Sequence, residues 1–155
     1  MAAAVVLSAS LYAQAKPNFS GKWTVDAEKT AAANPNMGGG GGGGGGRMGG
    51  GGGMGGGAIT ITMDAASLKT EQAMGENTMT ATFKLDGSES KNMGMGRGGQ
   101  TEQVSKATID GNKVVIKTTT ANGEQVTSWY MDGDWLVRER TTPNGAIKTY
   151  YKKAS

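Results

Sequence analysis

The chain has 155 residues, and neither cysteine nor histidine is among them. Without cysteine there is no disulfide framework, no thiolate nucleophile and no thiolate metal site. Without histidine there is no imidazole base, no ordinary catalytic triad and no common zinc site. The carboxylates show no spacing that singles out an acid–base pair. The sequence therefore predicts a protein that is not an enzyme and has no cofactor.

A strong net charge is also missing. The 16 basic and 13 acidic residues give a net charge of +3, which is too small to predict a nucleic-acid partner. The hydrophobic residues make up 36% of the chain, which is enough for one modest core. We therefore expect a single domain over residues 16–155, and the sequence leaves its oligomeric state open.

Residues 1–15 have the features of an export signal. The run from Ala2 to Ala13 is uncharged and largely apolar, and Ala13-Gln14-Ala15 is a small-x-small site of the kind that signal peptidase cleaves. The run is shorter than the roughly 18–20 residues that span a bilayer, so no stable membrane anchor is expected. We expect a signal peptide and a periplasmic or secreted bacterial protein. A buried, alanine-rich helix is the alternative.

Glycine is abundant, and most of it lies in one stretch. Residues 37–57 contain 17 of the 28 glycines. Fixing one backbone residue costs about 1–2 kcal/mol, and glycine loses the most freedom. We therefore expect residues 31–57 to be a disordered insert. A second glycine- and methionine-rich loop is expected at 92–99; its glycines have dinucleotide-binding spacing, but the residues after it predict a strand and not the helix that such a site needs.

Methionines interrupt both glycine-rich stretches. Thioether sulfur suits Cu(I), so capture of this metal, or surface interaction, by loops on a barrel scaffold is the alternative function. Because successive connections of a meander alternate between its two ends, we expect the two stretches at opposite ends. The candidate ligands are Met37, Met48, Met54, Met93 and Met95.

The remaining sequence has the period of two that is typical of strands. Over 58–63 and 77–85, apolar residues alternate with polar ones, mostly threonine. Asn-Gly and Asp-Gly pairs punctuate the chain and predict tight hairpins. No segment after the leader shows a helical period. We expect nine strands, near 19–25, 58–63, 67–74, 77–85, 100–109, 112–119, 123–131, 134–141 and 145–152.

Consecutive hairpins predict an all-β, antiparallel up-and-down meander of eight or nine strands. Such a meander removes its edges by closing into a barrel, with a two-sheet β-sandwich as the alternative. The predicted inner face is partly polar, as is usual in a barrel that holds a ligand. Its predicted polar members are Thr70, Gln72, Ser105, Thr118 and Ser128.

The segment Phe19-Ser20-Gly21-Lys22-Trp23 forms an F-x-G-x-W motif at the first predicted strand. It resembles the opening of the lipocalin and fatty-acid-binding superfamily and of lipocalin-like domains in small exported bacterial proteins. The resemblance implies that Gly21 and Trp23 belong to the barrel base, and that Arg138 or Arg140 packs over the Trp23 ring. Fatty-acid-binding proteins have a helix-turn-helix after the first strand, whereas this chain has its glycine-rich insert there.

These observations predict a non-enzymatic, exported, lipocalin-like barrel that binds a small, partly apolar molecule. The glycine-rich insert is expected to lie over the barrel mouth. Small inward residues leave room for a ligand among a few bulky ones. The candidate lining residues are Ala81, Phe83, Tyr130, Trp135 and Tyr151.

The export prediction has a direct check. The mature protein is expected to begin at Lys16, because the cleavage site lies immediately before it. Mass spectrometry of the N-terminus of the natively produced protein measures this. Recovery of a cytosolic form that still begins at Met1 would contradict it.

Overall fold

The structure is a computed structural model, and it describes residues 16–35, 58–74, 76–96, 99–120, 123–142 and 145–155. The predicted signal peptide, most of the glycine-rich insert and the position of that insert over the barrel mouth lie outside these residues. Within the described ranges, no helix is long and apolar enough to cross a membrane.

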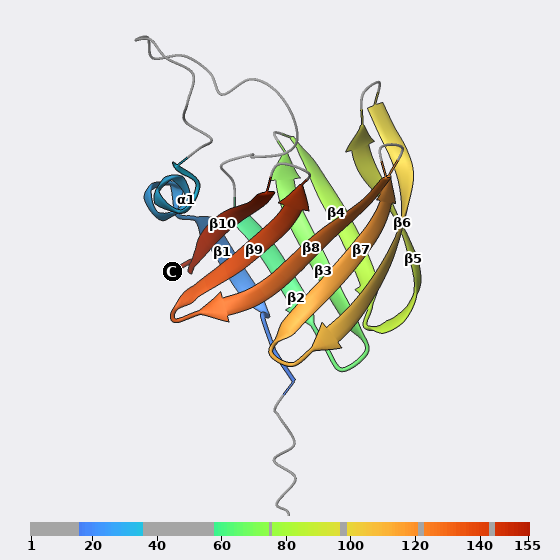
Figure 1. Cartoon of the computed structure of the whole chain (residues 1–155), viewed down its shortest axis with the longest axis horizontal. Coiled ribbons are helices and arrows are strands. Elements are labelled where there is room, and N and C mark those ends of the chain that lie inside the picture. Colours follow the sequence, from blue (N-terminus) through green and yellow to red (C-terminus); the bar gives the residue numbers. More distant parts are fainter. Residues whose placement is uncertain (1–15, 36–57, 75, 97–98, 121–122, 143–144) are drawn as a thin grey trace, which may run out of the picture.

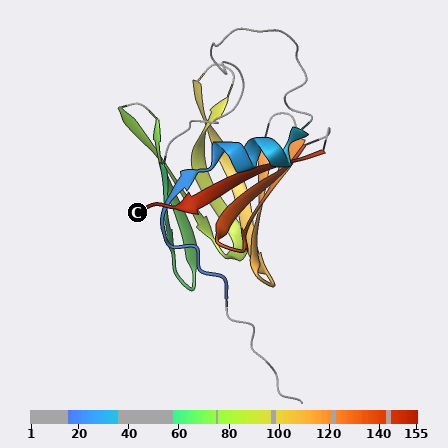
Figure 2. The same ribbon diagram turned by 90° about the vertical axis from the view of Figure 1, so that its left-hand side faces the viewer.

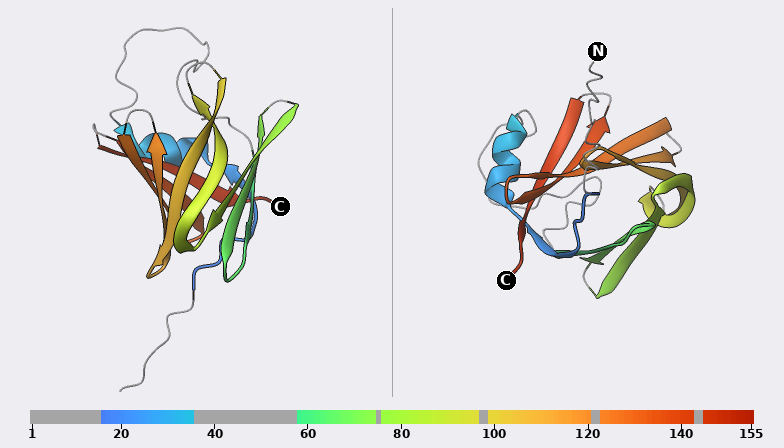
Figure 3. Two further views of the ribbon diagram at one scale, coloured as in Figure 1. Left: turned by 90° about the vertical axis from the view of Figure 1, so that its right-hand side faces the viewer. Right: turned by 90° about the horizontal axis from the view of Figure 1, so that it is seen from below.

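Ten strands follow one another in an antiparallel sheet of order β4-β3-β2-β1-β10-β9-β8-β7-β6-β5. The sheet curls until β4 and β5 are neighbours, so the strands enclose a ring (Figures 1 and 3). The prediction of an all-β, up-and-down barrel is confirmed. The elements are β1 (Gly21–Val25), α1 (Ala27–Ala33), β2 (Ala58–Met63), β3 (Ser67–Met74), β4 (Asn77–Lys84), β5 (Asp86–Gly96), β6 (Gly99–Asp110), β7 (Lys113–Thr120), β8 (Gly123–Asp132), β9 (Trp135–Thr142) and β10 (Gly145–Lys153).

The apolar core lies toward the end of the barrel that has the β2–β3, β6–β7 and β8–β9 turns, which is the lower end in Figure 1. Trp23 is 4% exposed, and its indole N–H donates to the carbonyl oxygen of Phe19 at 2.9 Å. Alternate residues of the strands around it share the inner face, as the period of two requires. The core members are Phe19, Trp23, Ile59, Ile61, Met63, Leu68, Leu85, Ala107, Val114, Ile116, Trp129, Leu136 and Tyr151.

The cation over the Trp23 ring is Lys153, whose Nζ lies 4.6 Å from the ring centroid. The expectation that Arg138 or Arg140 lies there is wrong, because β1 pairs with the end of β10 and sets Trp23 opposite Lys153. Gly21 makes room for this lysine: it has a φ of +136°, and a Cβ at this position would lie 2.7 Å from Lys153 Nζ. The backbone conformation thus favours glycine at this position of the F-x-G-x-W motif, whereas the lysine end could move to make space.

A short helix, which the sequence analysis did not predict, follows β1. The Asp26 carboxylate accepts from the Lys29 amide at 3.0 Å and caps α1, an alanine-rich segment with high helix propensity. This hydrogen bond holds the pKa of Asp26 below its ordinary value. The helix ends before Asn34 and Pro35. The predicted insert therefore has an ordered beginning at 31–35.

Helix α1 lies outside the barrel, along the edge of β10 that β1 does not reach (Figure 2). The Tyr150 amide donates to Thr30 Oγ1 at 2.9 Å, and the Lys148 amide donates to Asn34 Oδ1 at 3.0 Å. Asn34 Nδ2 returns a bond of 2.7 Å to the Lys148 carbonyl oxygen. Thr30 and Asn34, one helical turn apart, thus provide hydrogen-bond partners for backbone groups of β10 that would otherwise need a neighbouring strand.

A tenth strand, β5, occupies residues that were predicted to be a loop. It pairs with β6 through Gly96 and Gly99, so residues 92–96 of the second glycine-rich stretch are in a strand. The extra strand also changes the parity of the connections. The end of β5 and the start of β6 lie at the same end of the barrel as the start of β2, not at the opposite end as predicted.

Replacing Trp23 by alanine should lower the free energy of unfolding by about 3–5 kcal/mol, as deletion of a large core aromatic does. Chemical denaturation measures this. Trp135→Ala is the matched control, because Trp135 lies part-exposed on the outer face and should cost clearly less. Equal losses in the two variants would contradict the placement of Trp23 in the core.

Candidate binding site

Three of the five candidate lining residues face the barrel interior. Tyr151 belongs to the core, Phe83 packs against it, and Ala81 is paired with the inward Thr70. Tyr130 and Trp135 were wrongly predicted to face inward. They lie on the outer face, because the inward residues of β8 and β9 are Trp129 and Leu136.

The error in β9 has a physical cause. Val137 and Leu136 are neighbours on opposite faces, and both are 0% exposed. On the outer face, Val137 lies between Tyr150 of β10 and Tyr130 of β8, so burial along this strand does not alternate. A strand that is buried on both faces does not reveal its register by hydrophobicity. Ser128 is outward for the same register, since it pairs with Glu139.

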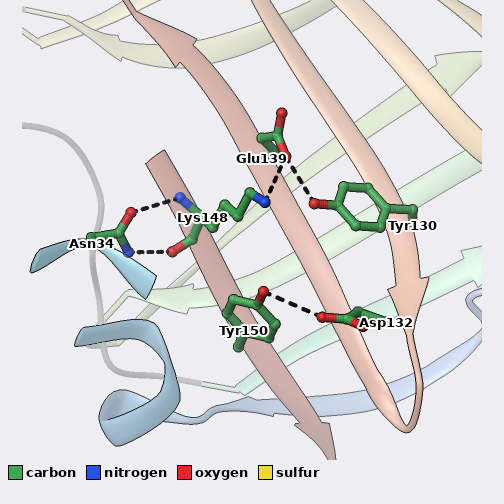
Figure 4. A network of polar contacts seen from close by, with 6 residues as sticks. All are labelled: Asn34, Tyr130, Asp132, Glu139, Lys148 and Tyr150. Carbon is green, nitrogen blue, oxygen red and sulfur yellow. Dashed lines mark hydrogen bonds and ion pairs between the residues drawn. The ribbon is translucent and has the colours of Figure 1, made fainter. Parts of the chain in front are cut away.

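The outer face of β8, β9 and β10 carries a network of polar side chains (Figure 4). The Tyr130 hydroxyl donates to Glu139 Oε2 at 2.8 Å, and Lys148 Nζ lies 3.6 Å from the same oxygen. The Tyr150 hydroxyl donates to Asp132 Oδ2 at 3.3 Å. Burial, and then the bond to Glu139, raise the pKa of Tyr130 well above its ordinary value. These groups have partners within the network, which therefore fastens the strands and leaves little for a ligand.

The inner face of β9 presents the opposite situation. Arg138 and Arg140 share the face of the core residue Leu136, since the three alternate along the strand. In the described part of the chain, neither guanidinium has a hydrogen bond or an ion pair. The register places no aspartate or glutamate on the inner faces of the ten strands. The interior is therefore positively charged and lacks a compensating group.

The two arginines differ in their surroundings. The Arg138 guanidinium carbon lies 5.8 Å from the Trp129 ring centroid and 5.9 Å from that of Tyr151, so two aromatic faces orient it. Arg140 has no such ring contact among the described residues. Burial, and then the charge of Arg138, lower the pKa of Arg140 from its ordinary value. Arg140 is thus the charge that most needs an external anion.

The Tyr151 hydroxyl completes this group. Burial raises its pKa against the opposing effect of Arg138 and Arg140, so the hydroxyl stays protonated and can donate. It has no hydrogen-bond partner among the described residues, although every buried side-chain nitrogen or oxygen there has one. The hydroxyl oxygen is therefore not completely covered, even though the residue is 2% exposed. It is free to donate a hydrogen bond beside the arginines.

The wall above the core is also accessible. Many of the inward side chains there are part-exposed, whereas those of the core, and Ser90, Ser105 and Thr149, are buried. Ser105 and Thr118 are inward as predicted and lie 2.8 Å apart through a hydrogen bond. The part-exposed wall residues include Thr70, Gln72, Met79, Ala81, Phe83, Thr118, Thr127 and Ile147.

The methionines are not gathered by the described structure. Met93 points outward from β5 and is 48% exposed. Met37, Met48 and Met54 lie outside the described residues, as does the side chain of Met95. Among the side chains that the structure describes, no group of three histidine, cysteine, aspartate or glutamate residues could hold a metal ion.

Comparison with solved structures identifies the architecture. A variant of the REP1-NXSQ fatty acid transporter superposes with a TM-score of 0.61 and 14% identity, over 87% of this chain and 97% of its own. A variant of the fluorescent protein UnaG gives 0.60 and 16% over 88% and 96%. The Schistosoma mansoni fatty acid binding protein in complex with arachidonic acid gives 0.58 and 16%, also over 88% and 96%. The barrel has the fatty-acid-binding-protein fold.

At these identities the likeness is one of fold. No protein-family model matches the sequence, and no curated protein matches it. After the first strand, the sequence analysis expected a glycine-rich insert and no helix. The structure has the short helix α1 at this place.

Removing the Arg140 charge should stabilise the unliganded protein. The Arg140 guanidinium is part-buried beside the like charge of Arg138, and both effects disfavour the charged form in the folded state. Arg140→Met should therefore raise the free energy of unfolding, by less than about 1 kcal/mol because solvent screens a part-exposed charge. Urea denaturation without added anions measures this. The control is Lys106→Met, which removes an exposed cation 3.7 Å from Glu89 and should gain nothing. A loss of stability in Arg140→Met would mean that the guanidinium has a partner.

Proposed function

We propose that the protein is an exported, non-enzymatic binding protein that holds a small, partly apolar anion inside its barrel. The observation that carries this is the pair of inward arginines without an acidic partner. Isolated buried charge is costly, and proteins keep it where a ligand compensates it. An arginine fork matches carboxylate, sulfonate and phosphate oxygens.

The apolar part of the ligand follows from the neighbouring wall. Four apolar residues of the inner face are part-exposed: Met79, Ala81, Phe83 and Ile147. Apolar surface is therefore available on the same face as the two arginines. Ligand sites combine apolar walls with a few convergent polar groups, which here are Arg140, Arg138 and Tyr151.

Binding without catalysis suits the same lining. The inner faces of the described strands bring arginine, tyrosine and hydroxyl groups together, but no carboxylate that would act as a base. Two of the structural neighbours are a fatty acid transporter and a fatty acid binding protein, and fatty acids are apolar anions. Export is supported by the apolar leader and its small-x-small site.

Anilinonaphthalene sulfonate, an apolar anionic fluorophore, tests the proposal. The folded protein should bind it saturably with a Kd in the micromolar range. Arg138→Gln combined with Arg140→Gln should weaken binding at least tenfold, because hydrogen bonds to charged groups contribute about 1.5–3 kcal/mol each. Ala81→Trp should abolish binding by filling the inner face while the barrel stays folded. Fluorescence titration measures all three.

Two outward cations serve as the control, since Lys91→Gln with Lys106→Gln removes the same net charge from exposed positions. This variant should bind as the unmodified protein does. If both double variants bind the probe equally weakly, the effect comes from net charge and not from the inward arginines. Fluorescence that grows only on partial unfolding would mean that the native interior takes no ligand.

A further inference from the structure

The contact between β4 and β5, which we call the seam, differs from every other contact in the described barrel wall. Antiparallel main-chain pairing joins each neighbouring pair in the strand order, from β4 and β3 round to β6 and β5. β4 and β5 are the two ends of that order, and no such pairing joins them.

Side chains of β5 close the seam in place of a backbone ladder. Asn92 Oδ1 accepts from the Thr82 amide at 2.8 Å, and Asn92 Nδ2 donates to the Thr82 carbonyl oxygen at 3.0 Å. Ser90 Oγ accepts from the Lys84 amide at 2.9 Å. A carboxamide has the donor and acceptor of a peptide group, so Asn92 replaces one rung of a ladder.

The lower end of the seam is fixed, and its upper end is not. Ser90 is buried, and the Leu85 amide donates to the Ala66 carbonyl oxygen at 2.8 Å. Above Asn92, no hydrogen bond joins the described residues of the two strands. The upper ends of β4 and β5 diverge there (Figure 3). Opening the seam from the top therefore requires the Asn92 bonds to break first.

The seam lies across the barrel from the arginine pair. Along the strand order, β9 is five strands from β4 and four from β5, which places Arg138 and Arg140 about halfway round the ring. Behind the seam, β4 presents Ala81 and Phe83 to the interior, and both are part-exposed. An elongated molecule whose anionic end lies at Arg140 would direct its apolar end toward this wall.

We propose that the seam is a lateral entrance for the ligand and that the Asn92 carboxamide is its latch. This inference rests on the proposed function. A latch that is closed in both the free and the bound protein sets the height of the barrier to exchange. Weakening it should accelerate association and dissociation together and leave the Kd nearly unchanged.

Stopped-flow exchange of anilinonaphthalene sulfonate in Asn92→Ala tests the entrance. Both rate constants should rise about tenfold, as expected for two lost hydrogen bonds, with the Kd within about twofold. Two controls are matched. Thr82→Ala keeps the backbone partner of the latch and should leave the rates unchanged. Asn34→Ala removes the same kind of bond from β10 and should lower stability without changing the rates.

Amide hydrogen exchange gives a second measurement on the unmodified chain. The Thr82 and Lys84 amides should exchange faster than the paired amides of β8 and β9, and Asn92→Ala should accelerate the Thr82 amide selectively. If Asn92→Ala does not fold, Ser90→Ala removes only the acceptor of the Lys84 amide and should accelerate probe exchange by a smaller factor.

The outcomes separate the two proposals. Binding of the probe with rates that Asn92→Ala leaves unchanged would overturn the entrance and leave the proposed function standing. Rates that respond to Asn34→Ala instead would overturn it by placing the route beside α1. Absence of saturable binding to the unmodified protein would overturn the proposed function and the entrance with it.

Discussion

Two stretches of strand edge in the described barrel have no strand hydrogen-bonded to their backbone: the part of β10 before Tyr151, and the facing sides of β4 and β5. Backbone amides and carbonyls at such edges must find partners or remain open to pairing with other chains. An asparagine carboxamide contacts both the amide and the carbonyl of one edge residue in each case, Asn34 at Lys148 and Asn92 at Thr82. The barrel therefore closes without a full complement of backbone ladders, and this solution determines where α1 lies and where the wall is weakest.

The outer and inner faces of the barrel differ in how their polar groups are paired. On the outside, Asp26 accepts from the Trp135 indole N–H at 3.4 Å, and Lys29 Nζ lies 3.9 Å above that ring. Polar groups there are paired within the protein. On the inside, Arg140 has the like charge of Arg138 near it and no hydrogen bond or ion pair among the described residues. Natural proteins keep such uncompensated groups at functional sites at a cost in stability, which is why we place the ligand on the inner face and not in the outer network.

Sequence reasoning found the barrel because nine strands alternate or are bounded by glycine turns. It missed β5, whose inward positions are Ser90, Asn92 and Gly94; a strand that closes a seam with polar side chains has no apolar alternation to detect. It missed α1 because Thr30 and Asn34 dock this helix, and no apolar stripe marks its face. The available signals were the Asp26 cap, the alanine run and Pro35.

The site was predicted in part for a related reason. Arg138 and Arg140 were selected through a motif that assigned them to Trp23, whereas their alternation with Leu136 places them in the interior. Which of two adjacent residues faces inward could not be read from β9, since Leu136 and Val137 are equally buried. The pairing of Leu136 with Tyr151 and of Arg138 with Trp129 fixes the face.

The pairing of β1 with β10 joins the first strand of the chain to the last. Trp23 and its lysine therefore meet only after β10 is available, and the strands that precede β10 cannot seal the base by themselves. Contacts between residues so distant in sequence form late and slowly, because the loop between them must close first. During synthesis the chain emerges as an incomplete sheet. A chain that has β1 but not yet β10 is therefore a sheet with an unpaired edge, which stays open to pairing with other chains until β10 docks.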